Sequence, residues 1–445
     1  MIEMKLDPTE LLETLISFDT RNDGHTKPEK ECPEFISGLL QNYGFHSEIL
    51  ESNGYFTVFA RRGHGSFKIL FLAHFDVVPF GDGWDSDPMK LRIEGDRAYG
   101  RGTCDDKGNI VSLLLLAEKA AESDFPCTIM IAASGDEELG GRQGAGFLKE
   151  YLMKQGLFPD YVVVADGSGQ NIIYRRRNIL PTFIKVKEKK QKIRGTKEII
   201  RVETETYGTN TRHSAYLRFG VDRHAMIAAS KYLDLNPQDV VESVNGAFLK
   251  GNVVPDWIEM EIIHPSEEGS EYTYDSALTD LMRSLLPITR VAFPTHPSDM
   301  GTNICPNILS KESDLWTLYI DIRSMTNDEE SVKLAIENAL KGRVDLFSLQ
   351  VHPGIGFVNC DPDSQLIKAA RWALEKEGIP YRIIEGFGAS DSRFFAGEGA
   401  DLFDFGPIGD NVHGVNEWVS LQSLRTTSEV YHTLIDVLIR KSGSL

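Results

Sequence analysis

Three consecutive carboxylates, Asp136, Glu137 and Glu138, follow the apolar stretch CTIMIAAS at residues 127–134. Placing like charges side by side costs free energy unless a cation or a shared proton offsets their repulsion. A solvated acidic loop is the ordinary alternative, because the formal net charge of the chain is -19. The carboxylates therefore indicate a functional site only if other cation-binding groups accompany them.

Two further polar pairs could provide such groups. His74 and Asp76 form an H-x-D pair at the end of the apolar stretch SFKILFLAHFD. Residues spaced by two project to the same side of a strand, so one can bind a metal while the other supports it from behind. Asp105 and Asp106 lie in RGTCDDKGN, at the start of a predicted helix. Acidic residues also stabilise helix N-termini, so this pair alone does not identify a ligand.

Two more ligand types follow other predicted strands, since Asp166 ends VVVAD and His413 lies in the polar segment GDNVHGVNE. The candidate ligands are then two imidazoles and three carboxylates: His74, Asp105, Glu138, Asp166 and His413. Such a set suits a pair of divalent ions about 3.5–4 Å apart, bridged by one carboxylate and one water. Nitrogen and hard oxygen ligands favour zinc, with cobalt and manganese as alternatives.

The first part of the chain alternates predicted strands and helices. Strands are expected at 66–76, 127–134 and 161–166, and helices at 109–122 and 144–154. This β-α-β-α-β rhythm predicts an α/β fold with a mostly parallel sheet and helices on both faces. The polar candidates follow the strand ends, where open α/β sheets place their ligands.

The pattern changes near residue 175, where β-type alternation and a dense cationic run replace the α/β rhythm. Helices are expected at 221–235 and 329–340, and strands at 257–263 and 315–323. The α/β rhythm returns with a helix at 365–378, a strand at 402–408 and a final helix at 423–441. We therefore predict a discontinuous catalytic domain, residues 1–179 and 353–445, and an inserted α+β domain, residues 180–352, without internal repeats.

The cationic run from Lys185 to Arg201 has two explanations. It could bind an anionic substrate, or it could form a solvated hairpin. The hairpin is favoured, because the cations alternate with Val, Ile and Thr as in an ordinary exposed strand pair.

Composition narrows the classes of function. The 445 residues are 41% hydrophobic and 25% charged, which is typical of a globular chain with substantial cores. The net charge of -19 argues against a nucleic-acid partner. The five cysteines are scattered without a CxxC pair, and neither a signal peptide nor a membrane-spanning stretch is recognisable. We expect a cytoplasmic protein with no nucleic-acid or membrane partner.

The motifs together resemble a known family, the M20 metallopeptidases. HFDVVP, YGRGTCDDKG, SGDEELGG, VVVAD and GPIGDNVHGVNEWVSL occur in the order and approximate spacing of that family. The resemblance runs from near residue 10 to near residue 435 and is weaker in the inserted domain. It implies a dinuclear metal-dependent hydrolase that cleaves amide bonds without a covalent acyl-enzyme.

The resemblance also implies a role for each candidate ligand. Asp105 matches the ligand that bridges the two metal ions. His74 and Asp166 would complete one metal site. Glu138 and His413 would complete the other. Two cations bound in this way would lower the pKa of the water that bridges them and polarise the scissile carbonyl.

Two further carboxylates gain roles from the resemblance. Glu137 matches the general base that takes a proton from the bridging water and can hand it to the leaving amine. Asp76 matches the carboxylate that supports the His74 imidazole. Glu137 and Glu138 would then be neighbours with separate functions.

The inserted domain resembles the family's lid, which commonly also mediates dimerisation, so we expect a homodimer. His213, in TRHSAY, matches a lid histidine that stabilises the oxyanion, often in the partner subunit's site. Arg323, in YIDIR, matches an arginine that grips a substrate carboxylate, with a strand-end salt bridge as the alternative. The family often has N-x-x-P before that strand, and we assign Asn307 to this place although no proline follows. Gly388 matches the G-x-x-x-D segment that shapes the substrate end of the site.

The substrate class follows by the same resemblance. Family members that act on peptides tend to carry Asp at position 166, which favours di- or tripeptides and carboxypeptidase substrates. An N-acyl-amino-acid deacylase, of the acetylornithine deacetylase or succinyl-diaminopimelate desuccinylase type, is the alternative. A metal-containing binding protein without catalytic activity is a third hypothesis, although the sequence retains the complete ligand set and the base.

Overall fold

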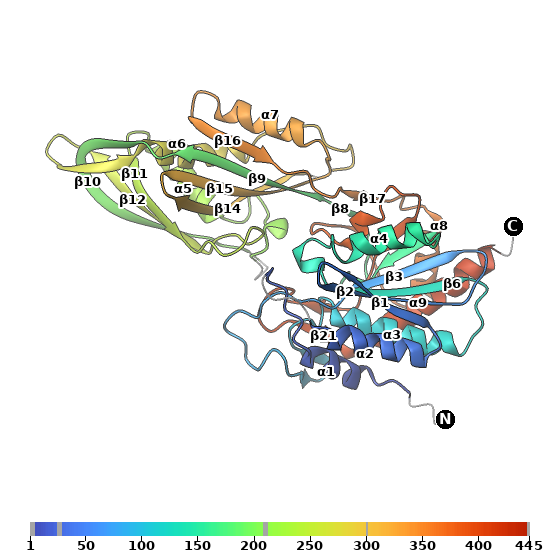
Figure 1. Cartoon of the computed structure of the whole chain (residues 1–445). Coiled ribbons are helices and arrows are strands. Elements are labelled where there is room, and N and C mark those ends of the chain that lie inside the picture. The colour runs from blue at the N-terminus through green and yellow to red at the C-terminus, as the bar shows by residue number, and fades with distance from the viewer. Residues whose placement is uncertain (1–4, 25–28, 208–211, 300, 443–445) are drawn as a thin grey trace. The chain divides into compact units, whose positions relative to one another are not determined.

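The computed structural model describes residues 5–24, 29–207, 212–299 and 301–442 and divides into two compact units (Figure 1). Unit 1 combines Met1–Arg176 with Val358–Leu445, and unit 2 is Arg177–Phe357. Unit 1 therefore contains all the candidate metal ligands, whereas unit 2 contains His213, Asn307 and Arg323. That unit 1 is a catalytic domain and unit 2 a lid stays a prediction at this point.

A nine-stranded mixed sheet forms the centre of unit 1, in the order β1-β2-β6-β3-β7-β19-β8-β17, with β18 beside β8. Its strands are β1 (His46–Ser52), β2 (Tyr55–Arg62), β3 (Lys68–His74), β6 (Thr128–Ser134), β7 (Tyr161–Val164), β8 (Ile172–Arg176), β17 (Val358–Asn359), β18 (Ile383–Gly386) and β19 (Asp401–Asp404). The central strands β6, β3, β7 and β19 are parallel, as the sequence predicts. Antiparallel β1 and β2 extend one edge, and β8 and β17 extend the other.

Helices cover both faces of this sheet, which confirms the predicted α/β class (Figure 1). One face packs against α1 (Pro8–Ser17), α2 (Glu31–Asn42), α3 (Lys107–Ala121), α8 (Gln365–Lys376) and α9 (Leu421–Ser442). The other packs against α4 (Ala145–Lys154). Because both faces are covered, β3 and β6 are buried at nearly every residue, which is why they read as continuous apolar runs.

The parallel register brings the ends of three strands to one edge of the sheet. His74 of β3 pairs with Ser134 of β6, and Leu72 of β3 pairs with Val164 of β7. The residues that follow β3, β6 and β7 are consequently neighbours although the sequence separates them widely.

A small second sheet in unit 1 positions the loop that contains His413. Its order is β20-β21-β5-β4, with strands β4 (Arg92–Glu94), β5 (Arg97–Tyr99), β20 (Gly409–Asp410) and β21 (Trp418–Ser420). Pairing of Trp418 with Tyr99 ties the loop 411–417 to the segment that leads into α3. Asp105 and His413 are thereby anchored to the same small sheet.

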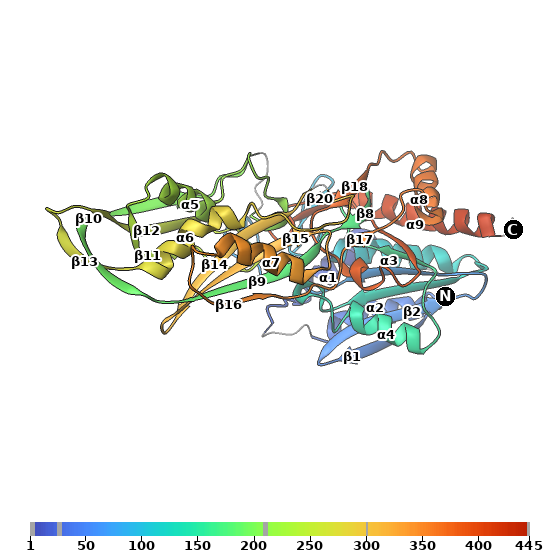
Figure 2. The same cartoon turned by 90° about the horizontal axis from the view of Figure 1, so that it is seen from above.

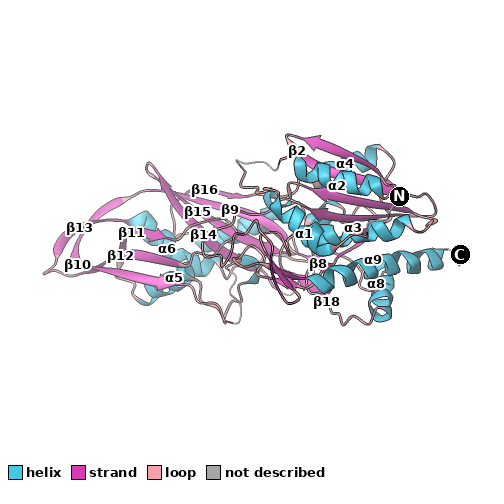
Figure 3. Cartoon of the chain, turned by 90° about the horizontal axis from the view of Figure 1, so that it is seen from below, coloured by secondary structure: helices cyan, strands magenta, loops and turns pink. Residues whose placement is uncertain are grey.

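Unit 2 contains two four-stranded antiparallel sheets (Figures 2 and 3). One has the order β11-β12-β10-β13, with β10 (Lys190–Glu203), β11 (Val240–Gly246), β12 (Trp257–Pro265) and β13 (Ser270–Asp275). The other has the order β14-β15-β9-β16, with β9 (Asn178–Lys187), β14 (Asn303–Glu312), β15 (Leu315–Ser324) and β16 (Leu346–Val351). The helices are α5 (Ala225–Leu235), α6 (Ser276–Ile288) and α7 (Glu329–Leu340), and all three pack into one apolar core with both sheets.

The cationic run Lys185–Arg201 does not form the hairpin that its alternation predicts. It spans β9 and β10, which are consecutive in the chain but belong to different sheets. Acidic neighbours balance its charges within the sheet that contains β10: Lys192 contacts Glu271 at 2.7 Å, and Lys197 contacts Glu242 at 2.5 Å. The alternation correctly indicated two strands. It could not indicate their pairing, because each strand pairs with strands far away in the sequence.

None of the described helices combines the length and the apolar character that a membrane crossing needs.

A buried histidine in unit 2 should make stability depend on pH. His224 begins α5, with its Nδ1 accepting the Met226 N–H at 3.2 Å and its Nε2 lying 3.4 Å from Asn307 Oδ1. Burial lowers its pKa to about 4 from an ordinary value of 6.5. Between these values the unfolded chain binds a proton that the folded chain does not, so this stability is complete above pH 6.5 and is lost as the pH falls toward 4.

We expect the free energy of unfolding to fall by about 2 kcal/mol between pH 7 and pH 5 on account of this one residue. In the variant His224→Asn, which retains a side chain able to cap the helix, that part of the pH dependence should disappear. Urea unfolding at the two pH values measures it. The exposed His46→Asn is the matched control, and an unchanged pH dependence in His224→Asn would refute the assignment.

Candidate metal centre

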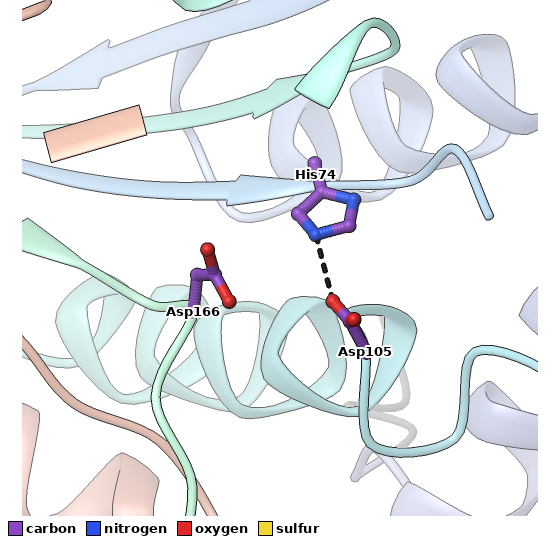
Figure 4. A group of neighbouring side chains, drawn as sticks. All are labelled: His74, Asp105 and Asp166. Atoms are coloured by element: carbon purple, nitrogen blue, oxygen red, sulfur yellow. Dashed lines mark hydrogen bonds and ion pairs between the residues drawn. The ribbon is translucent and has the colours of Figure 1, made fainter. Parts of the chain in front are cut away.

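Two groups of candidate ligands meet at the edge where the parallel strands end. The first contains His74, Asp105 and Asp166 (Figure 4), and the second contains Asp105, Glu138 and His413. In each group the ligand atoms lie within 4.8 Å of one another. Asp105 belongs to both groups, which is the arrangement expected of a carboxylate that bridges two cations.

Each ligand is positioned by the end of a regular element. His74 is the last residue of β3, and Asp166 lies two residues beyond β7. Glu138 belongs to the short 3-10 helix η1 (Glu137–Leu139), which follows β6. Asp105 precedes α3, and His413 lies in the loop between β20 and β21.

The His74 ring has an oxygen of a neighbouring residue beside each of its nitrogens. Its Nδ1 lies 3.0 Å from the Asp76 carbonyl oxygen, so Nδ1–H donates there. Its Nε2 faces Asp105 Oδ1 at 2.9 Å (Figure 4). A neutral ring protonated at Nδ1 presents the Nε2 lone pair to the centre, which is what a metal ligand requires.

Asp76 supports two parts of the centre. Its carboxylate lies 3.4 Å from His74 Nδ1, which agrees with the role implied by the family resemblance. The same carboxylate accepts the backbone N–H groups of Glu137 at 3.2 Å and Glu138 at 3.1 Å. Asp76 therefore also holds the turn that carries the predicted base and a predicted ligand, a second contact that the H-x-D spacing does not reveal.

His413 completes the second group. Its Nε2 lies 3.0 Å from Asp105 Oδ2 and 3.0 Å from Glu138 Oε1. The two oxygens of Asp105 thus face two different imidazoles, one from each end of the chain.

Electrostatics indicate that these residues suit a cation. Burial opposes charging of His413, but Glu138 and Asp105 raise its pKa well above the usual value. Burial also raises the pKa of Asp166 well above its usual value, because few positive groups offset the loss of water. Divalent cations among these nitrogen and oxygen donors would displace the protons and neutralise the carboxylates, so the donor set fits the predicted metal pair.

Glu137 lies beside the centre without belonging to either ligand group. Burial raises its pKa to about 8, and the nearby charges of Asp391 and Glu138 add to the effect. A carboxyl group whose pKa is raised toward neutrality can both take and release a proton, as a general base that later serves as an acid must.

Sequence reasoning missed Glu417. This side chain is fully buried, and its Oε1 accepts the N–H groups of Cys104 at 2.8 Å and Asp105 at 2.9 Å. Its Oε2 accepts from Gly102 N–H at 3.0 Å and from the Arg101 guanidinium at 2.8 Å. Glu417 therefore fixes the turn that carries Asp105. The available signal was an acidic residue directly before the apolar pair of β21.

Asp106 does not cap α3 as the alternative explanation of its position suggests. It occupies the N-cap position without a side-chain cap bond. Instead its Oδ2 accepts the backbone N–H of His74 at 3.0 Å, and its Oδ1 accepts from Asn109 at 2.6 Å. Asp106 thus supports His74 through the backbone.

The predicted residues of unit 2 have well-defined surroundings. His213 Nδ1 accepts the Ala215 N–H at 3.1 Å. Arg323 is 3% exposed and donates from Nε to Asp321 Oδ2 at 3.1 Å, so the strand-end ion pair considered as its alternative is present. Gly388, in unit 1, follows β18, and its role stays a prediction.

Asn307 requires a correction of the sequence comparison. Its side chain is fully buried and donates from Nδ2 to the Gly251 carbonyl at 2.6 Å. The N-x-x-P pattern thought to lack its proline is present four residues earlier, as Asn303-Ile304-Cys305-Pro306. Asn303 is the Cα partner of Arg323 across β14 and β15.

Known proteins resemble the chain over nearly its whole length. A succinyl-diaminopimelate desuccinylase from Xylella fastidiosa is 24% identical over 429 residues, which cover 93% of this chain and 95% of that protein. The aminoacylhistidine dipeptidase of Vibrio alginolyticus has a similar structure, with a TM-score of 0.67, 15% identity and coverage of 97% and 96% of the two chains. A tripeptidase from Staphylococcus aureus gives a TM-score of 0.64 at 14% identity and covers 98% of both chains.

The chain also matches a model of a protein family. The family is described as Peptidase family M20/M25/M40, and its model matches residues 70–437, which include every candidate metal ligand. The chain therefore belongs to the M20 peptidase family.

Proposed function

We propose that the protein is a dinuclear metal-dependent hydrolase that cleaves an amide bond in short peptides, as a dipeptidase, tripeptidase or carboxypeptidase. The observation that carries this proposal is the pair of ligand groups sharing Asp105, with Glu137 beside them. Unit 1 is the catalytic domain in this proposal, and unit 2 is the lid.

In the proposed reaction, one set of residues binds the metal ions and another residue transfers the proton. His74, Asp105, Glu138, Asp166 and His413 would hold two divalent cations. When bound, these cations would supply Lewis-acid polarisation of the amide carbonyl and would lower the pKa of the attacking water. Glu137 takes the proton of that water and delivers it to the leaving amine, so no side chain becomes acylated. Asp76 and Glu417 hold Glu137 and Asp105 in place through backbone N–H groups.

Zinc is the proposed metal, with cobalt or manganese as alternatives. The donor set supports this choice, because it combines two imidazoles with three carboxylates and no thiolate. All five cysteines are free, and four of them are buried. Free thiols are also what a reducing cytoplasm maintains, which supports the proposed location.

Two observations bear on the substrate. Asp166 and the structural similarity to a dipeptidase and a tripeptidase support peptides. The similarity to a desuccinylase supports the alternative, hydrolysis of an N-acyl amino acid. Both substrates carry a free carboxylate, for which we propose Arg323 as the binding residue and His213 as the group that stabilises the oxyanion. The homodimer expected from the family resemblance stays a prediction.

Replacement of the proposed base gives the first functional test. Glu137→Gln keeps the size of the side chain but cannot accept the proton, so we expect kcat to fall by roughly 10²–10⁴-fold. Metal content should remain that of the wild type, because Glu137 is not in either ligand group. The assay is hydrolysis of a panel of dipeptides, tripeptides, and acetylated and succinylated amino acids, with zinc, cobalt or manganese added to metal-free protein.

The exposed Glu51→Gln is the matched control for a lost carboxylate. Normal turnover by Glu137→Gln would remove it from the mechanism. Exclusive deacylation by the wild type would establish the alternative substrate class. A metal-loaded protein inert on the whole panel would instead favour the non-catalytic binding protein.

The support of Asp105 by Glu417 gives a second test. Glu417→Gln leaves the buried Arg101 without its charge partner, which should cost on the order of 3–5 kcal/mol of stability. It should also weaken metal binding by roughly 10–100-fold, because the turn that carries the bridging carboxylate loses its anchor. Metal titration of the folded variant, with the exposed Glu94→Gln as control, measures this effect. Unchanged metal affinity would limit Glu417 to a role in stability.

A further inference from the structure

Three consecutive arginines stand where the chain leaves unit 1, and their surroundings differ. Arg175, in β8, donates from Nε to Asn359 Oδ1 at 3.0 Å near the surface. Arg176 ends β8 and is only 7% exposed. Arg177 is the first residue of unit 2, where its Nε lies 3.8 Å from Asp299 Oδ1. Arg176 is therefore the arginine of this run whose buried charge must be compensated within unit 1.

Asp404 compensates the charge of Arg176. It is the last residue of β19, is 1% exposed and accepts from Arg176 Nε at 2.6 Å through Oδ2. The same oxygen accepts from Ser390 Oγ at 2.6 Å. Because this ion pair is buried and hydrogen-bonded on both sides, it holds the guanidinium in one orientation.

The stem of Arg176 packs against the backbone of β18. Gly386 is the Cα partner of Arg176 in the parallel pairing of β18 with β8. A Cβ atom added to Gly386 would lie 2.9 Å from Arg176 Cδ and 3.0 Å from its Nε, so the glycine leaves the space that the arginine fills. Val358 of β17 also pairs with Arg176. Both the backbone and the side chain of Arg176 are thus constrained.

Another hydrogen bond of Arg176 reaches a candidate metal ligand. Its Nη2 donates to the backbone carbonyl oxygen of Asp166 at 2.8 Å. Asp166 lies two residues beyond β7, and the Ala165 N–H before it still donates to the Leu72 carbonyl of β3 at 2.6 Å. The bond from Arg176 fixes the peptide group that follows Asp166. It therefore restricts rotation about the Cα–C bond of this ligand, and with it the direction of the side chain.

Asp166 belongs to one of the two ligand groups. It is a member of the group shown in Figure 4 and not of the group that contains His413. Glu417, by contrast, anchors Asp105, which both groups share. The contact between Arg176 and Asp166 thus acts on a ligand that serves a single metal site.

We propose that Arg176 is a positioning residue for Asp166 and that it sets the affinity of one of the two metal sites. It acts through the Asp166 carbonyl, while Asp404 and Gly386 hold its guanidinium in place. A guanidinium suits this role, because its planar N–H groups reach both acceptors at once. The ligand class is a divalent cation, so this inference rests on the proposed function. Arg176 makes the two metal sites unequal although they share Asp105.

Zinc titration of the metal-free full chain tests this role. Arg176→Lys keeps a positive charge beside Asp404, but an ammonium group lacks the planar fork that reaches both acceptors. One of the two zinc-binding steps should weaken by roughly 10–100-fold, and the other should not change. Arg175→Lys, a change in the neighbouring arginine that contacts Asn359, is the matched control. Equal weakening of both steps, or of neither, would overturn the proposal.

Variants of the ligands identify the affected step. Asp166→Asn should weaken the same step as Arg176→Lys, and His413→Asn should weaken the other. In the double variant of Arg176 and Asp166, the arginine change should add little, because the ligand that it positions is already impaired. A full additional loss in the double variant would show that Arg176 acts by another route. Excess zinc should restore the activity of Arg176→Lys, which it could not do for a misfolded chain.

Melting temperatures of the metal-free variants verify folding. If Arg176→Lys does not fold, Gly386→Ala replaces it, because the added methyl group displaces the Arg176 stem without removing a charge. Gly386→Ala should weaken the same zinc-binding step. An unchanged titration of the folded Gly386→Ala chain would then overturn the proposal.

The titration separates failure of the inference from failure of the proposed function. A wild-type chain that binds two zinc ions but hydrolyses nothing in the substrate panel would refute the proposed function, and the titration would still decide the role of Arg176. A wild-type chain that binds fewer than two ions would refute the metal pair and the inference together. Weakening of the step assigned to His413 would refute the inference alone.

Discussion

The structure of unit 1 depends on the electrostatic cost of placing three carboxylates, Asp105, Glu138 and Asp166, around one buried point. Asp105 faces His74 at 2.9 Å and His413 at 3.0 Å, and Glu138 and Asp166 lie within reach of the same atoms. Burying like charges without compensation is prohibitive, so positive charge must enter the centre. Protonated imidazoles can supply part of this positive charge. Divalent cations would supply more of it, and their binding would release the protons. Asp76 and Glu417 accept backbone N–H groups of the turns that carry Glu138 and Asp105, and these contacts restrict the movement of the candidate ligands.

The mixed sheet is a direct solution to that requirement. Parallel strands deliver their ends to one edge, and the three central strands that precede His74, Glu138 and Asp166 are parallel. In this sheet the antiparallel pairs lie toward the margins, and no candidate ligand follows the strands β1, β2, β8 and β17. The small sheet that contains β5 and β21 positions the two candidate ligands that do not follow central strands, Asp105 and His413.

Sequence patterns could predict which candidate ligands lie together, because each one follows a strongly apolar stretch or lies in a motif with an ordered set of companions. They could not predict Glu417, whose partners are backbone N–H groups more than 300 residues earlier in the chain. A backbone N–H group is present in nearly every residue, so the residue types in the sequence do not reveal such a contact. The β9–β10 hairpin failed for a related reason, since alternation identifies a strand but not its neighbour.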